Sequence, residues 1–305
     1  MHPKCFLIFG TILALVGPAR GQHDSKQRNQ PVAAPTAISS AFKREEYSLV
    51  ISICSKALPN ISDARQRALV LTYRAAAYRH LDQLENAMRD DDQALLLNPR
   101  TPFAHAGRAG IHDARGEIDQ SIAEYTAEIV VNPKYLPAYT NRGFWYRKRR
   151  EFDKAIADFN TATRLYPNDA ASYAELAIVY YLKGELEKVP AYLQQASAKM
   201  HWSSTEDEGA MRLLGWFRAT CPDARFRNCE EAVKWARRSC ELARWKESAS
   251  MDSLAAAYAE CGDFDRARKL EQQALKTAPK DRAEREKRLR LFQQHQPYRD
   301  TFLEP

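Results

Sequence analysis

The stretch LPAYTNRGFWYRKRREFDKAIADFNTATRLYP, residues 136–167, contains the pattern that decides the fold of this chain. It ends at Pro167, and prolines also stand at Pro99 and Pro133, so that successive prolines are 34 residues apart. Pro279 ends a later stretch of the same kind. A repeat of this length is typical of stacked helical hairpins, because one hairpin is too small to bury its apolar face alone.

Small residues recur at two fixed positions of the 34-residue period. The first set is Ala87, Ser121, Ala155, Val189 and Ala267, and the second is Ala75, Ala109, Gly143, Ala177 and Ala255. An aromatic ring or its polar substitute follows the second set at Tyr78, His112, Tyr146, Tyr180 and Tyr258. Small side chains let two helix axes approach closely. The period therefore predicts an all-α protein, a right-handed α-solenoid of stacked antiparallel hairpins.

Residues 136–167 also resemble a tetratricopeptide repeat almost position for position, through Tyr139, Gly143, Tyr146, Phe152, Ala155, Phe159, Ala162 and Pro167. Residues 248–279 match through Leu254, Ala255, Tyr258, Gly262, Phe264, Ala267, Ala274 and Pro279, and the units 68–101, 102–135 and 170–201 match more loosely. The chain is thus similar to exported bacterial tetratricopeptide-repeat proteins. The resemblance implies a scaffold for protein–protein contacts and implies no reaction.

The predicted solenoid extends over residues 37–295. Its hairpins are expected near 37–60, 68–101, 102–135, 136–169, 170–203, 206–245 and 248–281, followed by a capping helix at 281–295 and a C-terminal tail at 296–305. The capping helix is highly charged, so we expect only Leu289, Leu291 and Phe292 on its inner side and the other residues in water.

The first 21 residues have the pattern of a secretory signal peptide. Lys4 precedes the apolar run Cys5–Val16, and Ala19-Arg20-Gly21 offers small residues at a cleavage site before Gln22. The apolar run is shorter than the roughly 20 residues that span a bilayer, although an uncleaved anchor or a misassigned start is the alternative. Residues 22–36 are predicted to form a flexible leader. We therefore expect an exported protein, periplasmic or secreted, with no stable membrane insertion after cleavage.

The composition excludes several classes of function. Cleavage would lower the formal net charge of +7 by two, and 28% of the residues are charged with both signs, which is typical of a soluble surface rather than of a nucleic-acid platform. The chain has no His-Glu-x-x-His, Gly-x-Ser-x-Gly or Cys-x-x-Cys motif and no Gly-rich phosphate loop. We therefore predict no catalytic residue, no cofactor, no metal and no nucleic-acid partner.

Two polar groups allow more than one interpretation. His105, His112 and Glu128 form either a polar or metal-binding pocket between helices or a hydrogen-bonded packing group. The run Arg147 to Arg150 is either a solvated edge or a contact for an acidic partner.

Five cysteines remain after cleavage, so at least one of them is unpaired. Cys221, Cys229 and Cys261 are placed at one end of the stack by their positions near helix ends. Cys240 lies about 16 Å along its helix from Cys229 at 1.5 Å per residue. Any disulfide should therefore join two of Cys221, Cys229 and Cys261, with Cys54 and Cys240 unpaired; buried free thiols are the alternative.

The family resemblance implies a partner-binding groove lined by first-helix positions of successive repeats. Carried over to this sequence, these positions are Tyr73, Arg79, His80, Phe103, Asp113, Asn141, Phe144, Arg147, Lys148, Glu175, Ile178 and Tyr181. Asn141 matches one residue of the clamp that binds chaperone tails, but the other clamp residues are missing, which argues against such a ligand. Aromatic and arginine side chains are enriched at binding hot spots. We expect an extended or helical partner segment that is amphipathic and somewhat acidic.

The sequence thus favours a non-catalytic, extracytoplasmic scaffold that binds an unidentified protein or peptide segment in its groove. The alternative is a structural or assembly component of the cell envelope that acts by oligomerisation.

N-terminal sequencing of the mature protein tests the export signal. Because the small residues before Gln22 suit signal peptidase, we expect the mature chain to begin at or near Gln22. A cytosolic protein that keeps Met1 would contradict this prediction.

Overall fold

The computed structural model describes residues 34–277 and 282–300, and all regular secondary structure within these ranges is helical. The predicted signal peptide, most of the predicted leader and residues 301–305 lie outside the described residues. The described residues form two compact units, the N-terminal unit up to Arg142 and the C-terminal unit from Gly143 onward. The division between them falls within helix α7 (Leu136–Lys148).

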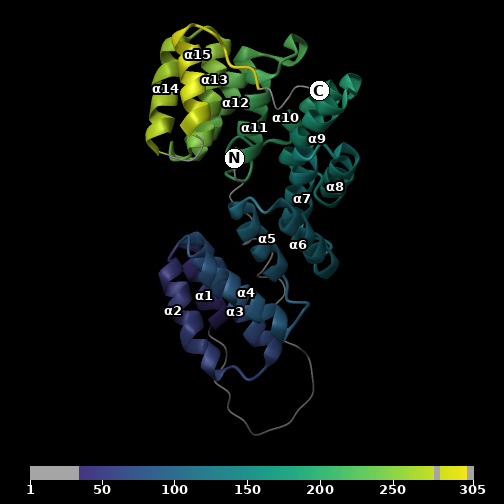
Figure 1. The fold of residues 1–305 in the computed structure, drawn as a ribbon, viewed down its shortest axis with the longest axis vertical. Coiled ribbons are helices and arrows are strands. Elements are labelled where there is room, and N and C mark those ends of the chain that lie inside the picture. Colours follow the sequence, from purple (N-terminus) through teal and green to yellow (C-terminus); the bar gives the residue numbers. More distant parts are fainter. Residues whose placement is uncertain (1–33, 278–281, 301–305) are drawn as a thin grey trace. The chain divides into compact units, whose positions relative to one another are not determined.

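The N-terminal unit consists of helices that pack in chain order (Figure 1). They are α1 (Ala34–Lys43), α2 (Tyr47–Ala57), the short 3-10 helix η2 (Leu58–Asn60), α3 (Ala64–His80), α4 (Leu84–Leu97), α5 (Ala104–Arg115) and α6 (Ile118–Val131). Helix α1 begins inside the stretch predicted as leader. Its Ile38 and Phe42 are buried and lie one helical turn apart, so they give this helix an apolar face that packs against α2.

The C-terminal unit continues the same alternation after α7. Its helices are α8 (Phe152–Leu165), α9 (Ala170–Lys183), η3 (Leu186–Lys188), α10 (Val189–Lys199), α11 (Glu208–Thr220), η4 (Ala224–Phe226), α12 (Cys229–Leu242), α13 (Ser248–Glu260), α14 (Phe264–Thr277) and α15 (Arg282–Gln293). First helices of neighbouring hairpins also contact each other, as α9 contacts α11 and α11 contacts α13. Among the helices described, none is both long and apolar enough to cross a membrane.

The small residues of the 34-residue period lie where helices meet. Every alanine, serine and valine of the two sets has no exposed surface: Ala75, Ala87, Ala109, Ser121, Ala155, Ala177, Val189, Ala255 and Ala267. At Gly143 an added Cβ would come within 3.0 Å of the Phe159 ring, so this glycine also lies at a close helix contact. These positions support the predicted all-α repeat solenoid, and the fold class is confirmed.

The turns inside the hairpins repeat with the same period. One residue of the turn adopts a left-handed conformation, with φ of +58° at Asp82, +74° at Gly116, +59° at Arg150 and +85° at Gly184. Glycine adopts this conformation without the strain that a side chain brings. The left-handed conformation therefore explains why the turns of these two hairpins contain Gly116 and Gly184.

Helix α15 differs from the predicted solvated cap. Phe292 is fully buried as expected, whereas Leu289 and Leu291 are only partly buried. Arg285 and Arg288, which a charged cap should place in water, are buried instead. They can lie inside because both are paired with acids: Arg285 binds Asp252 through two nitrogens at 2.9 Å, and Arg288 lies 2.9 Å from a carboxylate oxygen of Glu271.

Residues 296–300 of the predicted tail pack back on α11. The Tyr298 side chain is buried, and its ring lies 5.7 Å from that of Trp216. The Trp216 indole N–H donates to Asp300 at 2.7 Å, and the Asp300 amide donates to the Thr220 carbonyl at 3.0 Å. The described part of the tail is thus a structural element of the C-terminal unit.

Gly215→Ala tests the close approach of α11 and α12. A Cβ at Gly215 would lie 2.9 Å from the backbone nitrogen of Ala236, an atom that cannot move without shifting the helix. We expect a loss of about 1–3 kcal/mol in the free energy of unfolding, measured by urea denaturation. Gly209→Ala on the same helix is the control, because no atom lies within 4 Å of its Cβ and alanine favours the helix. Equal stability of the two variants would contradict the prediction.

Candidate functional site

The predicted groove residues on α3 are engaged in packing and pairing within the N-terminal unit. Tyr73 is partly buried against the apolar cluster of this unit. The His80 ring stacks on Tyr47 with the centroids 4.2 Å apart. The Arg79 guanidinium lies 2.6 Å from the carboxylate of Asp91, which is completely buried. Arg79 is therefore held by an internal carboxyl group, so a partner would have to compete for it.

The Arg79–Asp91 pair fits only because a glycine faces it from α5. A Cβ at Gly107 would overlap both the Asp91 carboxylate and the Arg79 guanidinium. Burial raises the pKa of Asp91 to about 8, and the nearby Arg79 opposes this rise.

Asp113 and Asn141 belong to a hydrogen-bond network inside the N-terminal unit. Asp113 is buried and accepts hydrogen bonds from the hydroxyls of Ser121 and Tyr125, the latter at 2.7 Å. Asn141 donates from its side-chain amide to the Tyr125 hydroxyl at 3.0 Å. Asp113 thus has no accessible groove surface. Removing the Asn141 amide would disturb this network as well as any binding surface.

The three residues of the possible polar pocket are not brought together as one site. Glu128 is buried and accepts backbone N–H bonds from Phe103 at 3.0 Å and Ala106 at 3.2 Å, so it caps the start of α5. His105 is paired with Glu124 at 2.7 Å, and His112 is paired with Glu117 at 2.5 Å. In the part of the chain that the structure describes, no group of three His, Cys, Asp or Glu side chains could hold a metal ion.

Burial also limits the predicted groove at three other residues. Phe103 is buried and packs edge-on against Tyr135, with ring centroids 5.0 Å apart. Ile178 and Tyr181 are buried in the core of the C-terminal unit, where Tyr181 meets Phe217 edge-on at 5.6 Å. These three residues fill the interior. Ile178 and Tyr181 lie on α9, which α8, α10 and α11 cover, whereas Phe103 precedes α5 as its N-cap residue.

The remaining predicted residues form one cluster on α7 and α9 of the C-terminal unit. Phe144 is partly exposed, and its ring lies 5.1 Å from the Arg147 guanidinium carbon and 5.8 Å from the Lys148 ammonium nitrogen. Arg147 also pairs with Glu175 at 2.8 Å. Lys148 is exposed. We call Phe144, Arg147, Lys148 and Glu175 the α7 cluster; it presents an aromatic ring and an accessible positive charge.

Two family models described as tetratricopeptide repeat match the chain, at residues 137–169 and 248–278. The chain contains tetratricopeptide repeats. No curated protein matches it in sequence.

Solved structures show the same fold. A tetratricopeptide-repeat protein from Parabacteroides merdae ATCC 43184 superposes with a TM-score of 0.58 at 14% identity, over 84% of this chain and 96% of that one. The APC/C hetero-tetramer Cut9–Hcn1 gives a TM-score of 0.64 at 16% identity over 84% of this chain, which spans only 48% of that chain. Tetratricopeptide repeats typically have no catalytic activity, and they support a role in protein–protein interaction.

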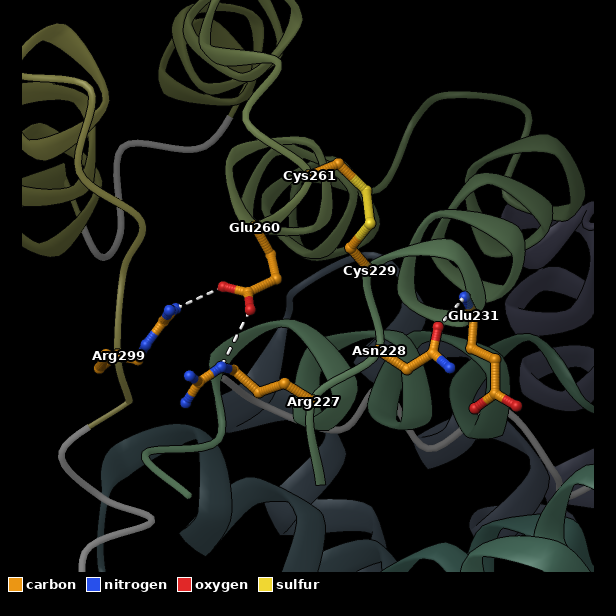
Figure 2. The surroundings of a disulfide bond; sticks show 7 residues. All are labelled: Arg227, Asn228, Cys229, Glu231, Glu260, Cys261 and Arg299. Carbon is orange, nitrogen blue, oxygen red and sulfur yellow. Dashed lines mark hydrogen bonds and ion pairs between the residues drawn. A yellow bond between two sulfur atoms is a disulfide. The ribbon is translucent and has the colours of Figure 1, made fainter. Parts of the chain in front are cut away.

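This tetratricopeptide-repeat protein contains a disulfide between Cys229 at the start of α12 and Cys261 at the end of α13 (Figure 2). Both belong to the set of cysteines for which a bridge was predicted. Cys54, Cys221 and Cys240 are free and buried. Beside the bridge, Glu260 lies 2.9 Å from Arg227 and 2.7 Å from Arg299 (Figure 2). The disulfide and these ion pairs fasten α13 to both the α11–α12 loop and the C-terminal tail.

Asp91→Asn tests the buried acid beside Arg79. The raised pKa means that the folded protein keeps a proton that the unfolded chain loses near pH 4. This contribution to stability is therefore complete below about pH 4 and is lost as the pH rises through about 8. We expect urea midpoints at pH 5 and pH 8 to show that the wild type loses stability relative to Asp91→Asn as the pH rises.

Glu271→Gln gives an independent comparison in the C-terminal unit, where burial raises the pKa of Glu271 to about 8. The same relative change with pH is expected there, and the effects of the two variants should add because the groups share no partner. Parallel pH profiles for wild type and both variants would contradict these assignments.

Proposed function

We propose that this chain is a non-catalytic extracytoplasmic scaffold that binds a protein or peptide segment at the α7 cluster. The observation that carries the proposal is the partly exposed Phe144 ring, with the Arg147 and Lys148 cations 5.1 and 5.8 Å from its centre. Aromatic and arginine side chains are the types that supply most binding energy at protein interfaces. The cations also hold the ring in place, so less side-chain freedom is lost on binding.

The charge of the α7 cluster indicates the character of the partner segment. Glu175 pairs with Arg147 at 2.8 Å, and the exposed Lys148 adds a second positive charge to the same surface. Arg149 and Arg150, which follow in the turn, are exposed and extend this charge. A segment with an apolar side chain for Phe144 and a carboxylate for Lys148 fits these groups. The partner is thus an amphipathic, somewhat acidic segment, extended or helical.

Two features support an extracytoplasmic setting. Residues 1–21 have the pattern of a signal peptide. The Cys229–Cys261 disulfide is typical of proteins from oxidising compartments, because cytosolic thiols are kept reduced.

Lys148→Glu tests the α7 cluster. Peptides are selected from a displayed random library on the full mature protein, and their affinities are then measured by calorimetry. We expect the selected peptides to be acidic and to contain an apolar residue. Their affinity should fall about tenfold for Lys148→Glu, because the glutamate repels the carboxylates that the lysine attracts. Phe144→Ala should weaken the same peptides, whereas Lys246→Glu, an exposed lysine after α12, is the charge-matched control.

Equal affinity for Lys148→Glu and Lys246→Glu would rule out the α7 cluster as the binding site. Failure to enrich any peptide, together with a native mass that corresponds to an oligomer, would favour the alternative role in envelope assembly. Thermal midpoints of all variants are compared first, so that unfolding is not mistaken for lost binding.

A further inference from the structure

A second aromatic and basic surface lies on α12 and the segment between α10 and α11. Trp202, in that segment, is 50% exposed, and its ring lies 6.0 Å from the ring of the buried Trp235 on α12. An indole that is half in water and half packed on a second ring is a fixed apolar contact point. This residue lies between the repeat-like units 170–201 and 248–279, so the repeat pattern assigns it no role.

Two cations of α12 lie against these rings, and a third stands on the same helix face. Lys234, Arg237 and Arg238 stand at helical spacings of three and four residues, which places them on one face. The Lys234 ammonium lies 4.4 Å from the centre of the Trp235 ring and 5.9 Å from that of Trp202. The Arg238 guanidinium lies 5.3 Å from the Trp202 ring, and its Nε donates to the Trp202 carbonyl at 2.6 Å.

The surface continues onto the neighbouring helices through Tyr258 of α13. Arg237 donates to the Tyr258 hydroxyl, and its guanidinium lies 5.8 Å from the centre of the ring. Arg266 of α14 lies 5.1 Å from the same ring. We call Trp202, Lys234, Arg237, Arg238 and Arg266 the α12 surface.

The charges of the α12 surface are only partly balanced. Arg238 pairs with Glu241 at 2.8 Å, and Arg266 pairs with Asp263 at 3.0 Å. Lys234 and Arg237 are both exposed. Among the residues that the structure describes, no carboxylate lies within ion-pair distance of either one. Among the described residues, two accessible cations of this surface thus lack acidic partners, and one of them, Lys234, lies beside the exposed Trp202 indole.

We propose that the α12 surface binds an acidic peptide segment of another protein, with carboxylates on Lys234 and Arg237 and an apolar side chain on Trp202. Spacings of three residues along the helix bring the two cations about 5–6 Å apart at their Cβ atoms, within reach of carboxylates on one short segment. This site is separate from the α7 cluster and does not depend on it. The α7 cluster lies on first helices of hairpins, whereas α12 is a second helix.

The geometry favours a peptide over an anionic membrane. Membrane attachment by a surface scales with the apolar area that enters the bilayer, and here half of a single indole is exposed. Arg238 is held by the Trp202 carbonyl and Arg237 by the Tyr258 hydroxyl, so these cations have fixed positions. Fixed charges suit a ligand whose own charges are spaced along a chain.

The test measures fluorescence anisotropy of a labelled glutamate- and leucine-containing peptide with the full mature protein. The same peptide with glutamine in place of glutamate and vesicles of phosphatidylglycerol are the comparison ligands. The main variant is Lys234→Glu with Arg237→Glu, and Trp202→Ala tests the apolar contact. Lys246→Glu with Lys269→Glu is the matched control, because both lysines are exposed in the same unit.

The glutamate peptide is expected to bind the wild type more tightly than the glutamine peptide. We expect a loss of about tenfold or more in affinity for the double variant, a smaller loss for Trp202→Ala, and little change for the matched control. Lys148→Glu should leave a large part of this binding intact, which separates the α12 surface from the α7 cluster.

Equal affinity for the double variant and its matched control would overturn the proposal, as would equal binding of the two peptides. Loss of vesicle binding without loss of peptide binding would assign the surface to lipid and would also overturn it. Should the double variant show a lowered thermal midpoint, Lys234→Gln with Arg237→Gln replaces it, with a smaller but measurable loss expected.

Discussion

The close approach of neighbouring helices is the constraint on which the rest of the structure depends. Residues such as Ala75, Ala87 and Ala155 have no exposed surface, and each stands where a larger side chain would push two helices apart. Gly215 is the extreme case, since even a methyl group there would meet the backbone of α12. Tight stacking buries the apolar faces that single hairpins leave exposed, and it leaves little room for polar groups between helices. Any ionisable group that remains inside must therefore be paired or hydrogen-bonded.

Paired charges occupy several of these internal positions. Arg285 lies against the carboxylate of Asp252, and Arg79 lies against the carboxyl group of Asp91, where aliphatic pairs could stand. Buried ion pairs of this kind add little net stability, because desolvation offsets their attraction, but loss of one partner is strongly destabilising. They therefore restrict which helices can be neighbours more than they strengthen the stack. Gly107 leaves the room that the Arg79–Asp91 pair needs, because a Cβ at this position would overlap both side chains.

The period of small residues was sufficient to predict the fold, because helix contact depends on side-chain size and spacing, which a sequence displays directly. The candidate site was less accessible. Phe144, Arg147, Lys148 and Glu175 do come together, whereas Asp113 and Tyr181 are buried, since family positions do not reveal which faces the neighbouring helices cover. Ion pairs join residues that no period relates. The α12 surface depends on Trp202, which lies between the repeat-like units 170–201 and 248–279.

The return of residues 296–300 to α11 changes how the end of the array can come apart. In a simple stack each hairpin touches only its neighbours, so the last one can fray while the others stay folded. Here the Trp216–Asp300 hydrogen bond at 2.7 Å connects positions 84 residues apart, and α12, α13, α14 and α15 lie between them in the chain. The contacts from α11 through α15 and back to α11 form a closed ring. Opening any one member of the ring removes support from both sides, so this end of the protein unfolds as one cooperative block.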